Sequence, residues 1–297
     1  MKCDLCPRKC LVDRKKGEKG ICGQTENLKV ARAALHFWEE PCISGDAGSG
    51  AVFFSGCPLH CVFCQNENIA NGTVGKEISV ERLAEIFLEL QEKGANNINL
   101  VTPGHFVPQI TKALDLAKQE GLKLPIVYNT SSYETVETIK RLEGYVDIYL
   151  PDFKYMSPGL SKKYSHAPDY AEVAKAAIAE MVRQTGKAVF VNGDEDNLIL
   201  RGTIVRHLTL PGCMADSMQI LKYLHETYGD MIYISIMNQF TPLSNLEKYP
   251  ELNRRINDEE YETLVDYAID IGIENGFIQE GNTAEESFIP AFDCEGV

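Results

Sequence analysis

The chain has no long apolar segment and no excess of positive charge, and both absences narrow its function. No apolar run approaches the ~20 residues of a membrane span. The N-terminal stretch MKCDLCPRKC lacks the apolar core of a signal peptide. The 29 Lys and Arg residues are outnumbered by 43 Asp and Glu residues, so the net charge is −14. We therefore predict a cytoplasmic protein that binds neither membranes nor nucleic acid.

The negative charge is unevenly distributed along the chain. Residues 1–32 contain nine Lys and Arg and four Asp and Glu, a balance of +5, which leaves −19 for the remainder of the total of −14. This basic segment is either a solvated, lysine-rich metal-binding segment or a docking patch for an acidic partner.

A fourth cysteine is missing from an otherwise dense cysteine motif. In GCPLHCVFCQN (56–66), Cys57, Cys61 and Cys64 form the pattern C-x3-C-x2-C, directly after the apolar run AVFFS. No further cysteine follows within reach. Compact cysteine runs of this kind hold iron-sulfur clusters, and three ligands leave one iron of a cubane cluster open. The alternative is a zinc loop that borrows a distant fourth cysteine.

A second group of cysteines stands at the N-terminus. Cys3, Cys6, Cys10 and Cys22 form C-x2-C-x3-C-x11-C. Cysteines in a reducing compartment are more naturally metal ligands than disulfides. Four ligands make a closed site, so we predict a structural or electron-transferring group, with zinc and a second iron-sulfur cluster as equal alternatives.

The remainder of the chain alternates between strand-like and helix-like segments. Apolar β-rich stretches at 51–56, 97–104, 125–131, 146–153, 203–212 and 231–240 each precede an amphipathic segment, and a last short strand follows at 276–281. Six such units predict right-handed crossovers and a parallel sheet, either an open doubly wound sheet or a full or partial barrel. In either topology the chemistry gathers at the C-terminal ends of the strands.

The cysteine motif resembles the signature loop of the radical S-adenosylmethionine (SAM) superfamily, which also has an aromatic residue, here Phe63, before the last cysteine. The runs CPRKC and HFWEEPCISG, with the signature loop, are similar to the branch homologous to pyruvate formate-lyase activating enzyme. The resemblance implies an α/β fold in which a cysteine-rich extension (1–50) precedes a partial (βα)6 TIM-like barrel (51–297). It also implies a [4Fe-4S] cluster on Cys57, Cys61 and Cys64, whose open iron chelates the amino and carboxylate groups of SAM.

The strand ends suggest which residues surround this cofactor. The resemblance implies backbone contacts at Thr102 and Gly104 and a D-x-K element at Asp152 and Lys154, although these two residues also suit a simple ion pair. The other candidates at the strand ends are His105, Asn129, Ser131, Arg206, Met237 and Gln239. Several of these residues also have an ordinary structural role. His105 suits the beginning of a helix, Arg206 a salt bridge and Met237 the core, while Ser132 suits the N-cap of a helix that begins near Glu134.

The resemblance further implies reductive cleavage of SAM to a 5′-deoxyadenosyl radical, which takes a hydrogen atom from a substrate. A glycyl radical enzyme is the first expected substrate, and a small metabolite or a peptide is the alternative. A non-catalytic metal-binding or redox-sensing scaffold is the third reading. A flavodoxin- or ferredoxin-type protein is the expected reductant.

Overall fold

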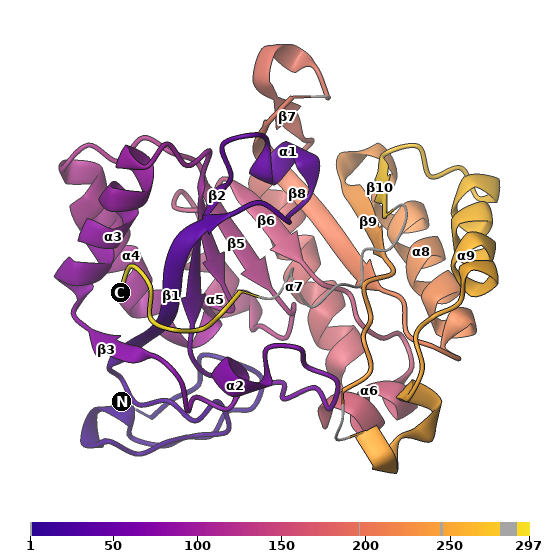
Figure 1. The fold of residues 1–297 in the computed structure, drawn as a ribbon, viewed down its shortest axis with the longest axis horizontal. Coiled ribbons are helices and arrows are strands. Elements are labelled where there is room, and N and C mark those ends of the chain that lie inside the picture. The colour runs from indigo at the N-terminus through magenta and orange to yellow at the C-terminus, as the bar shows by residue number, and fades with distance from the viewer. Residues whose placement is uncertain (1, 196, 244–245, 280–289) are drawn as a thin grey trace.

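The computed structural model describes residues 2–195, 197–243, 246–279 and 290–297. Its centre is a curved sheet of parallel strands, which Figure 1 shows face on. In spatial order the parallel strands are β2 (Ser49–Phe54), β4 (Ile98–Val101), β5 (Ile126–Thr130), β6 (Ile148–Pro151), β8 (Ile199–Leu208), β9 (Tyr233–Met237) and β10 (Gly276–Ile278). The first six confirm the predicted strands. The end of the predicted 276–281 segment lies outside the described residues.

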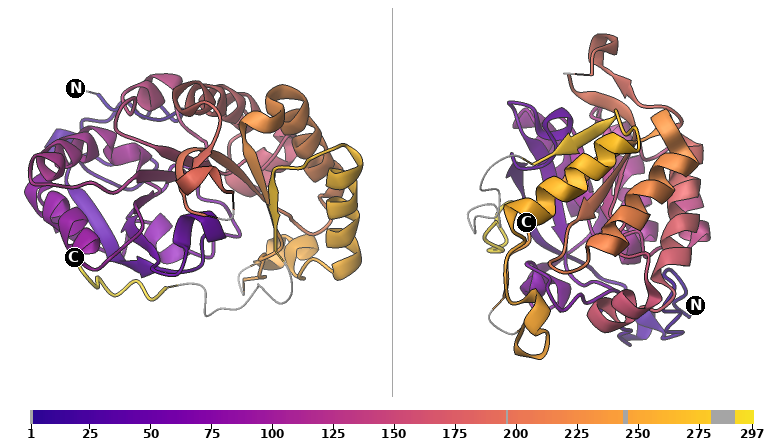
Figure 2. Two further views of the ribbon diagram at one scale, coloured as in Figure 1. Left: turned by 90° about the horizontal axis from the view of Figure 1, so that it is seen from above. Right: turned by 90° about the vertical axis from the view of Figure 1, so that its right-hand side faces the viewer.

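Helices line the outer side of the sheet, as the view from above in Figure 2 shows. They are α3 (Val80–Glu92), α4 (Val107–Gln119), α5 (Val136–Lys140), α7 (Tyr170–Thr185), α8 (Met214–Tyr228) and α9 (Asp258–Asp270). Every residue of β2, β4, β5, β6 and β9 is buried, as expected for parallel strands with both faces covered. The fold is therefore an α/β partial barrel of six strand-helix units, as predicted.

Side-chain caps define where the helices begin. The Ser79 hydroxyl accepts from the Arg82 amide at 3.1 Å at the start of α3. Helix α5 differs from the prediction, because the hydroxyl that accepts from the Thr138 amide belongs to Thr135. Ser132 has a positive φ of 63° and is three residues too early to cap this helix.

An unpredicted antiparallel strand extends the sheet beyond β2. Strand β1 (Leu28–His36) pairs with β2, and β3 (Lys76–Ile78) pairs with the start of β1. Residues 290–297 lie along the other edge of β1, where the Ala33 amide donates to Glu295 O at 2.8 Å. Residues 28–50 thus differ from the predicted extension: much of this segment is built into the sheet, and the cysteine-rich head comprises residues 2–27.

Short elements complete the chain. The remaining helices and strand are α1 (Pro41–Ser44), α2 (Glu67–Ala70), α6 (Pro158–Ser165) and β7 (Val189–Phe190). Single 3-10 turns cover Arg14–Lys16, Gly104–Phe106, Val191–Gly193, Gly229–Met231, Leu246–Lys248 and Pro250–Leu252. Within the described ranges, no helix is both long and apolar enough to cross a membrane.

Candidate active site

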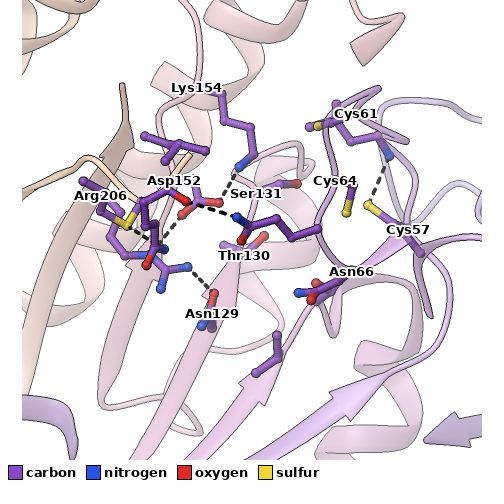
Figure 3. A pocket seen from close by; sticks show the side chains of 18 of the residues that line it. Cys57, Cys61, Cys64, Asn66, Asn129, Thr130, Ser131, Asp152, Lys154 and Arg206 are labelled. Atoms are coloured by element: carbon purple, nitrogen blue, oxygen red, sulfur yellow. Dashed lines mark hydrogen bonds and ion pairs between the residues drawn. The ribbon is translucent and has the colours of Figure 1, made fainter. Parts of the chain in front are cut away.

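A cavity of about 270 Å³ opens inside the curved sheet at the C-terminal ends of the parallel strands. Figure 3 shows the side chains that point into it. On one side lie the three signature cysteines. On the other lie charged side chains from β8 and from the segment after β6, and Asn129 and Thr130 lie between the two sides. The cavity therefore lies where the βα topology gathers functional groups.

The cysteine loop leaves β2 through a glycine that no other residue can replace without strain. Gly56 has a φ of 91°, and a Cβ there would stand 2.5 Å from the carbonyl oxygen of Cys22. Beyond it, Cys57, Cys61 and Cys64 all line the cavity. Two sulfurs accept hydrogen bonds: Cys57 Sγ from the Leu59 amide at 3.4 Å, and Cys61 Sγ from the Ser165 hydroxyl at 3.0 Å. Donors of this kind stabilise a thiolate.

Burial governs the ionisation of these thiols. It raises the pKa of Cys57 to about 11 and that of Cys64 to about 12, and it also raises the pKa of Cys61. Lys154 opposes the shift at Cys61, because its ammonium favours a nearby thiolate. Without a metal the three groups are thus protonated thiols, and a metal centre would displace their protons.

The three thiols fit an iron-sulfur cluster. Cys57, Cys61 and Cys64 come from one short loop and face a cavity that also has polar side chains. Compact cysteine runs of this kind hold [4Fe-4S] clusters, and three ligands leave one of the four irons open.

Arg206 organises the charged side of the cavity. Its Nε donates to Asp152 Oδ1 at 3.0 Å, its Nη1 to Glu39 Oε2 at 2.9 Å and its Nη2 to Asn129 Oδ1 at 2.6 Å. The Lys154 ammonium donates to the other Asp152 oxygen at 2.6 Å. Two carboxylates and two cations thus balance one another, so the buried network carries no net charge.

The partners keep these groups ionised despite burial. Burial alone would raise the pKa of Asp152, but Lys154 and Arg206 outweigh it and hold that pKa below its usual value. Burial would lower the pKa of Lys154, and the Asp152 carboxylate reverses the effect and raises it. A charged row therefore faces the cysteines across the cavity.

Most of the predicted site residues line this cavity. Those that do are Phe63, Thr102, Asn129, Ser131, Asp152, Lys154, Arg206, Met237 and Gln239, with the three signature cysteines. The alternatives for two of them are also correct, since Asp152 pairs with Lys154 and Arg206 forms salt bridges. The role of each residue toward a cofactor stays a prediction.

Gly104 and His105 lie outside the cavity, which corrects their predicted placement. A Cβ at Gly104 would overlap the buried Glu134 carboxylate, so this glycine serves close packing. The His105 Nε2 donates to Ser55 O at 2.7 Å, and its ring packs against Phe106. Burial lowers the pKa of His105 to about 3, so its ring is neutral.

Glu39 is a site residue that the sequence analysis did not predict. It follows β1, lines the cavity, and its Oε1 accepts from Asn99 at 3.0 Å and from Asn129 at 3.2 Å. His36 and Trp38 from the same segment also line the cavity. The stretch HFWEE gives no local signal for this placement, because antiparallel pairing of β1 on β2 carries the segment there.

The cysteine-rich head packs behind the signature loop. Arg8 donates to Pro58 O at 2.9 Å, and His60 Nε2 donates to Ile21 O at 2.7 Å. Cys6 and Cys22 are buried, and the Ile21 amide donates to Cys10 Sγ at 3.3 Å. Neighbouring thiols of the head contribute to the raised pKa values of Cys6 and Cys22, although burial is the main cause. A second metal group on Cys3, Cys6, Cys10 and Cys22 stays a prediction.

Comparison with known proteins assigns the chain to one superfamily. Residues 51–198 match the model of the radical SAM superfamily. The chain belongs to this superfamily, whose members bind a [4Fe-4S] cluster and SAM and cleave SAM reductively. An uncharacterized protein of Methanocaldococcus jannaschii is 27% identical over 276 residues, which cover 90% of this chain and 74% of that protein.

Solved structures share the fold at low sequence identity. The match to SuiB of Streptococcus suis, bound to its precursor peptide SuiA, covers 75% of this chain and 46% of the SuiB chain, with a TM-score of 0.51 and 14% identity. The match to HydG, a maturase of the [FeFe]-hydrogenase, covers 76% of this chain and 50% of the HydG chain, with a TM-score of 0.51 and 15% identity. The match to methylornithine synthase (PylB) covers 80% of this chain and 66% of the PylB chain, with a TM-score of 0.50 and 15% identity. The chain spans about half the length of SuiB and HydG.

Proposed function

We propose that this protein abstracts a hydrogen atom from a protein or peptide substrate, with a glycyl radical enzyme as the first candidate. The observation that carries the proposal is the cavity itself, in which the three signature cysteines face an ionised row of side chains. When bound, the reduced cluster supplies the electron that cleaves the sulfonium of SAM, which yields methionine and the 5′-deoxyadenosyl radical that attacks the substrate.

The charged row retains donors for the polar groups of SAM. A guanidinium has five N–H groups, and Arg206 uses three of them on Asp152, Glu39 and Asn129. The Lys154 ammonium has three, of which one is bonded to Asp152. We assign the carboxylate of SAM to these donors, and the amides of Asn129 and Gln239 to its ribose and base. These residues hold the cofactor in position, and the signature loop excludes water behind it.

Exposed aromatic side chains beside the cavity favour a protein or peptide substrate. Phe37 is 49% exposed and Trp38 is 59% exposed, and both belong to the segment that carries Glu39 into the site. Trp38 also lines the cavity. Large exposed aromatic residues typically mark contact surfaces for macromolecules. SuiB, which shares the fold, was solved with a precursor peptide bound.

Anaerobic reconstitution tests the chemistry. The protein is loaded with iron and sulfide, reduced with dithionite and given SAM, and we expect release of 5′-deoxyadenosine and methionine. A count of iron, sulfide and zinc accompanies the assay and decides between the alternatives for the head cysteines. Absence of 5′-deoxyadenosine from protein with an intact cluster would contradict the proposal and favour the non-catalytic scaffold.

The substrate class needs a separate experiment. We expect an electron paramagnetic resonance signal of a glycyl radical when the active protein is incubated with a glycyl radical enzyme from the same organism. If SAM is cleaved and no such signal forms, a different peptide or a small metabolite is the substrate. A Trp38→Ala variant separates these two: slower turnover of SAM in the presence of a protein substrate supports the peptide alternative.

A further inference from the structure

We propose that the outer surface of the cysteine-rich head is the docking site for a small acidic protein that delivers one electron to the cluster. The inference rests on the proposed function, since only a redox-active cluster needs such a carrier. In the transfer the carrier loses one electron and the cluster gains it, and no covalent bond forms or breaks.

The head contacts the cysteine loop from outside the cavity. None of residues 2–27 lines the cavity, yet they contact the loop directly. Arg8 binds Pro58 O, Ile21 O binds His60, and the carbonyl oxygen of Cys22 lies against Gly56. In Figure 1 the head, in indigo, lies below the strands near α2. Because the proposed function places SAM and substrate on the cavity side, we place the carrier on the side that the head covers.

The docking surface consists of two lysines and two apolar residues around the contact between Gly20 and the Cys10 side chain. Gly20 packs against Cys10, where a Cβ on Gly20 would stand 2.8 Å from Cys10 Sγ. Residues on either side of this contact point outward: Lys9 and Lys19 are exposed, Leu11 is 54% exposed and Ile21 is 48% exposed. An apolar centre with a charged rim is the usual composition of a docking interface, and electron-transfer complexes use small ones.

The charge of the surface selects an acidic partner. Three further lysines of the head, Lys2, Lys15 and Lys16, are also exposed, and Lys15 lies 3.8 Å from the Glu26 carboxylate. Residues 2–27 contain seven Lys and Arg and four Asp and Glu, a balance of +3. The head is thus a basic surface on a protein of net charge −14, which orients an acidic carrier toward this face.

The experiment compares two reductants on the full chain carrying its reconstituted cluster. The test variant is Lys9→Glu with Lys19→Glu. The control is Lys93→Glu with Lys123→Glu, which makes the same charge change at exposed positions following α3 and α4, at the opposite end of the barrel. We expect release of 5′-deoxyadenosine with a reduced flavodoxin or ferredoxin to fall at least about tenfold in the test variant at low salt. With dithionite, both variants should match the wild type.

Direct binding gives an independent readout. A flavodoxin should bind the wild type with an affinity that falls as salt rises, and bind the test variant more weakly than the control. An Ile21→Ser variant should weaken binding with little change in salt dependence.

Equal binding of flavodoxin by both charge variants would overturn the docking site. So would a test variant that loses the dithionite reaction as much as the flavodoxin reaction, because that result would indicate a folding role for the two lysines. Tighter binding of a DNA duplex than of flavodoxin at this surface would also overturn the assignment. A wild type that binds flavodoxin but fails with dithionite would instead contradict the proposed function.

Discussion

Arg206 joins four segments that are distant in the sequence. It lies on β8, and its three hydrogen bonds reach Asp152 after β6, Asn129 on β5 and Glu39 after β1. Such a buried network stabilises the fold only while its charges are balanced, because an unpaired charge in the interior is costly. Each member is therefore a sensitive test of the site's organisation.

Removing the charge of Glu39 should destabilise the protein. We expect Glu39→Gln to lower the free energy of unfolding by about 2 kcal/mol, since the ion pair with Arg206 is lost while the cation stays buried. Urea denaturation of the metal-free, reduced protein measures the change. The matched control is Glu92→Gln at an exposed position of α3. Equal midpoints for the two variants would contradict the network as described.

Glu134 should make stability depend on pH. Burial raises its pKa from 4.5 to about 7, although the Thr130 and Tyr128 hydroxyls donate to it. Below pH 4.5 the carboxyl is neutral in both the folded and the unfolded state, so its ionisation does not change the free energy of unfolding. Between pH 4.5 and about 7 only the unfolded state ionises, so stability falls as pH rises.

A Glu134→Gln variant should remove this dependence. The free energy of unfolding of the variant, relative to that of the wild type, should rise by about 3 kcal/mol between pH 4.5 and 7 and then level off. Unfolding free energies at several pH values measure the difference, and Glu92→Gln should show no such trend. A constant difference across this range would contradict a neutral Glu134 in the folded protein.

The head packs against the signature loop at Gly56. Gly56 and Gly94 both have positive φ values, 91° and 84°, so alanine strains the backbone at either position. They differ in surroundings, because a Cβ at Gly56 meets Cys22 O and Gln24, whereas nothing lies within 4 Å of one at Gly94. The pair therefore separates backbone strain from the packing of the head.

Gly56→Ala should loosen the head more than Gly94→Ala does. We expect a lower melting temperature and faster proteolysis within residues 2–27 for Gly56→Ala, because the new methyl group pushes Cys22 and Gln24 away. For Gly94→Ala we expect only the smaller loss due to its backbone conformation. Identical proteolysis of the head in the two variants would show that this contact does not hold it.

Local patterns in the sequence predicted the elements that depend on neighbouring residues. The repeat of apolar residues gave the parallel strands and their helices, and the spacing of Cys57, Cys61 and Cys64 gave the ligand loop. Strand β1 escaped prediction because LKVARAALH is rich in alanine, which has a low β propensity, and because its pairing with β2 and the 290–297 segment is nonlocal. Glu39 was missed for the same reason. His105 was misplaced because position at a strand end does not fix which way a side chain points.

The whole molecule places the cavity and the cysteine-rich head on opposite sides of one loop. The signature cysteines face the cavity, and the head covers the back of the loop. The barrel topology determines where the cavity lies, and the packing of residues 2–27 determines where the head lies. Our two proposals assign the reaction to the first side and the docking of an electron carrier to the second.

Release of 5′-deoxyadenosine by the wild type and by Cys61→Ala tests the central claim most directly. Both proteins are reconstituted anaerobically, reduced with dithionite and assayed with their iron content measured in the same samples. We predict turnover of SAM by the wild type, and loss of both the barrel iron and the product in Cys61→Ala, because two thiols retain a cubane cluster poorly. A Cys213→Ala variant, altered outside the cavity lining, should retain both. Equal product from the wild type and Cys61→Ala would contradict the assignment of the cluster to this loop.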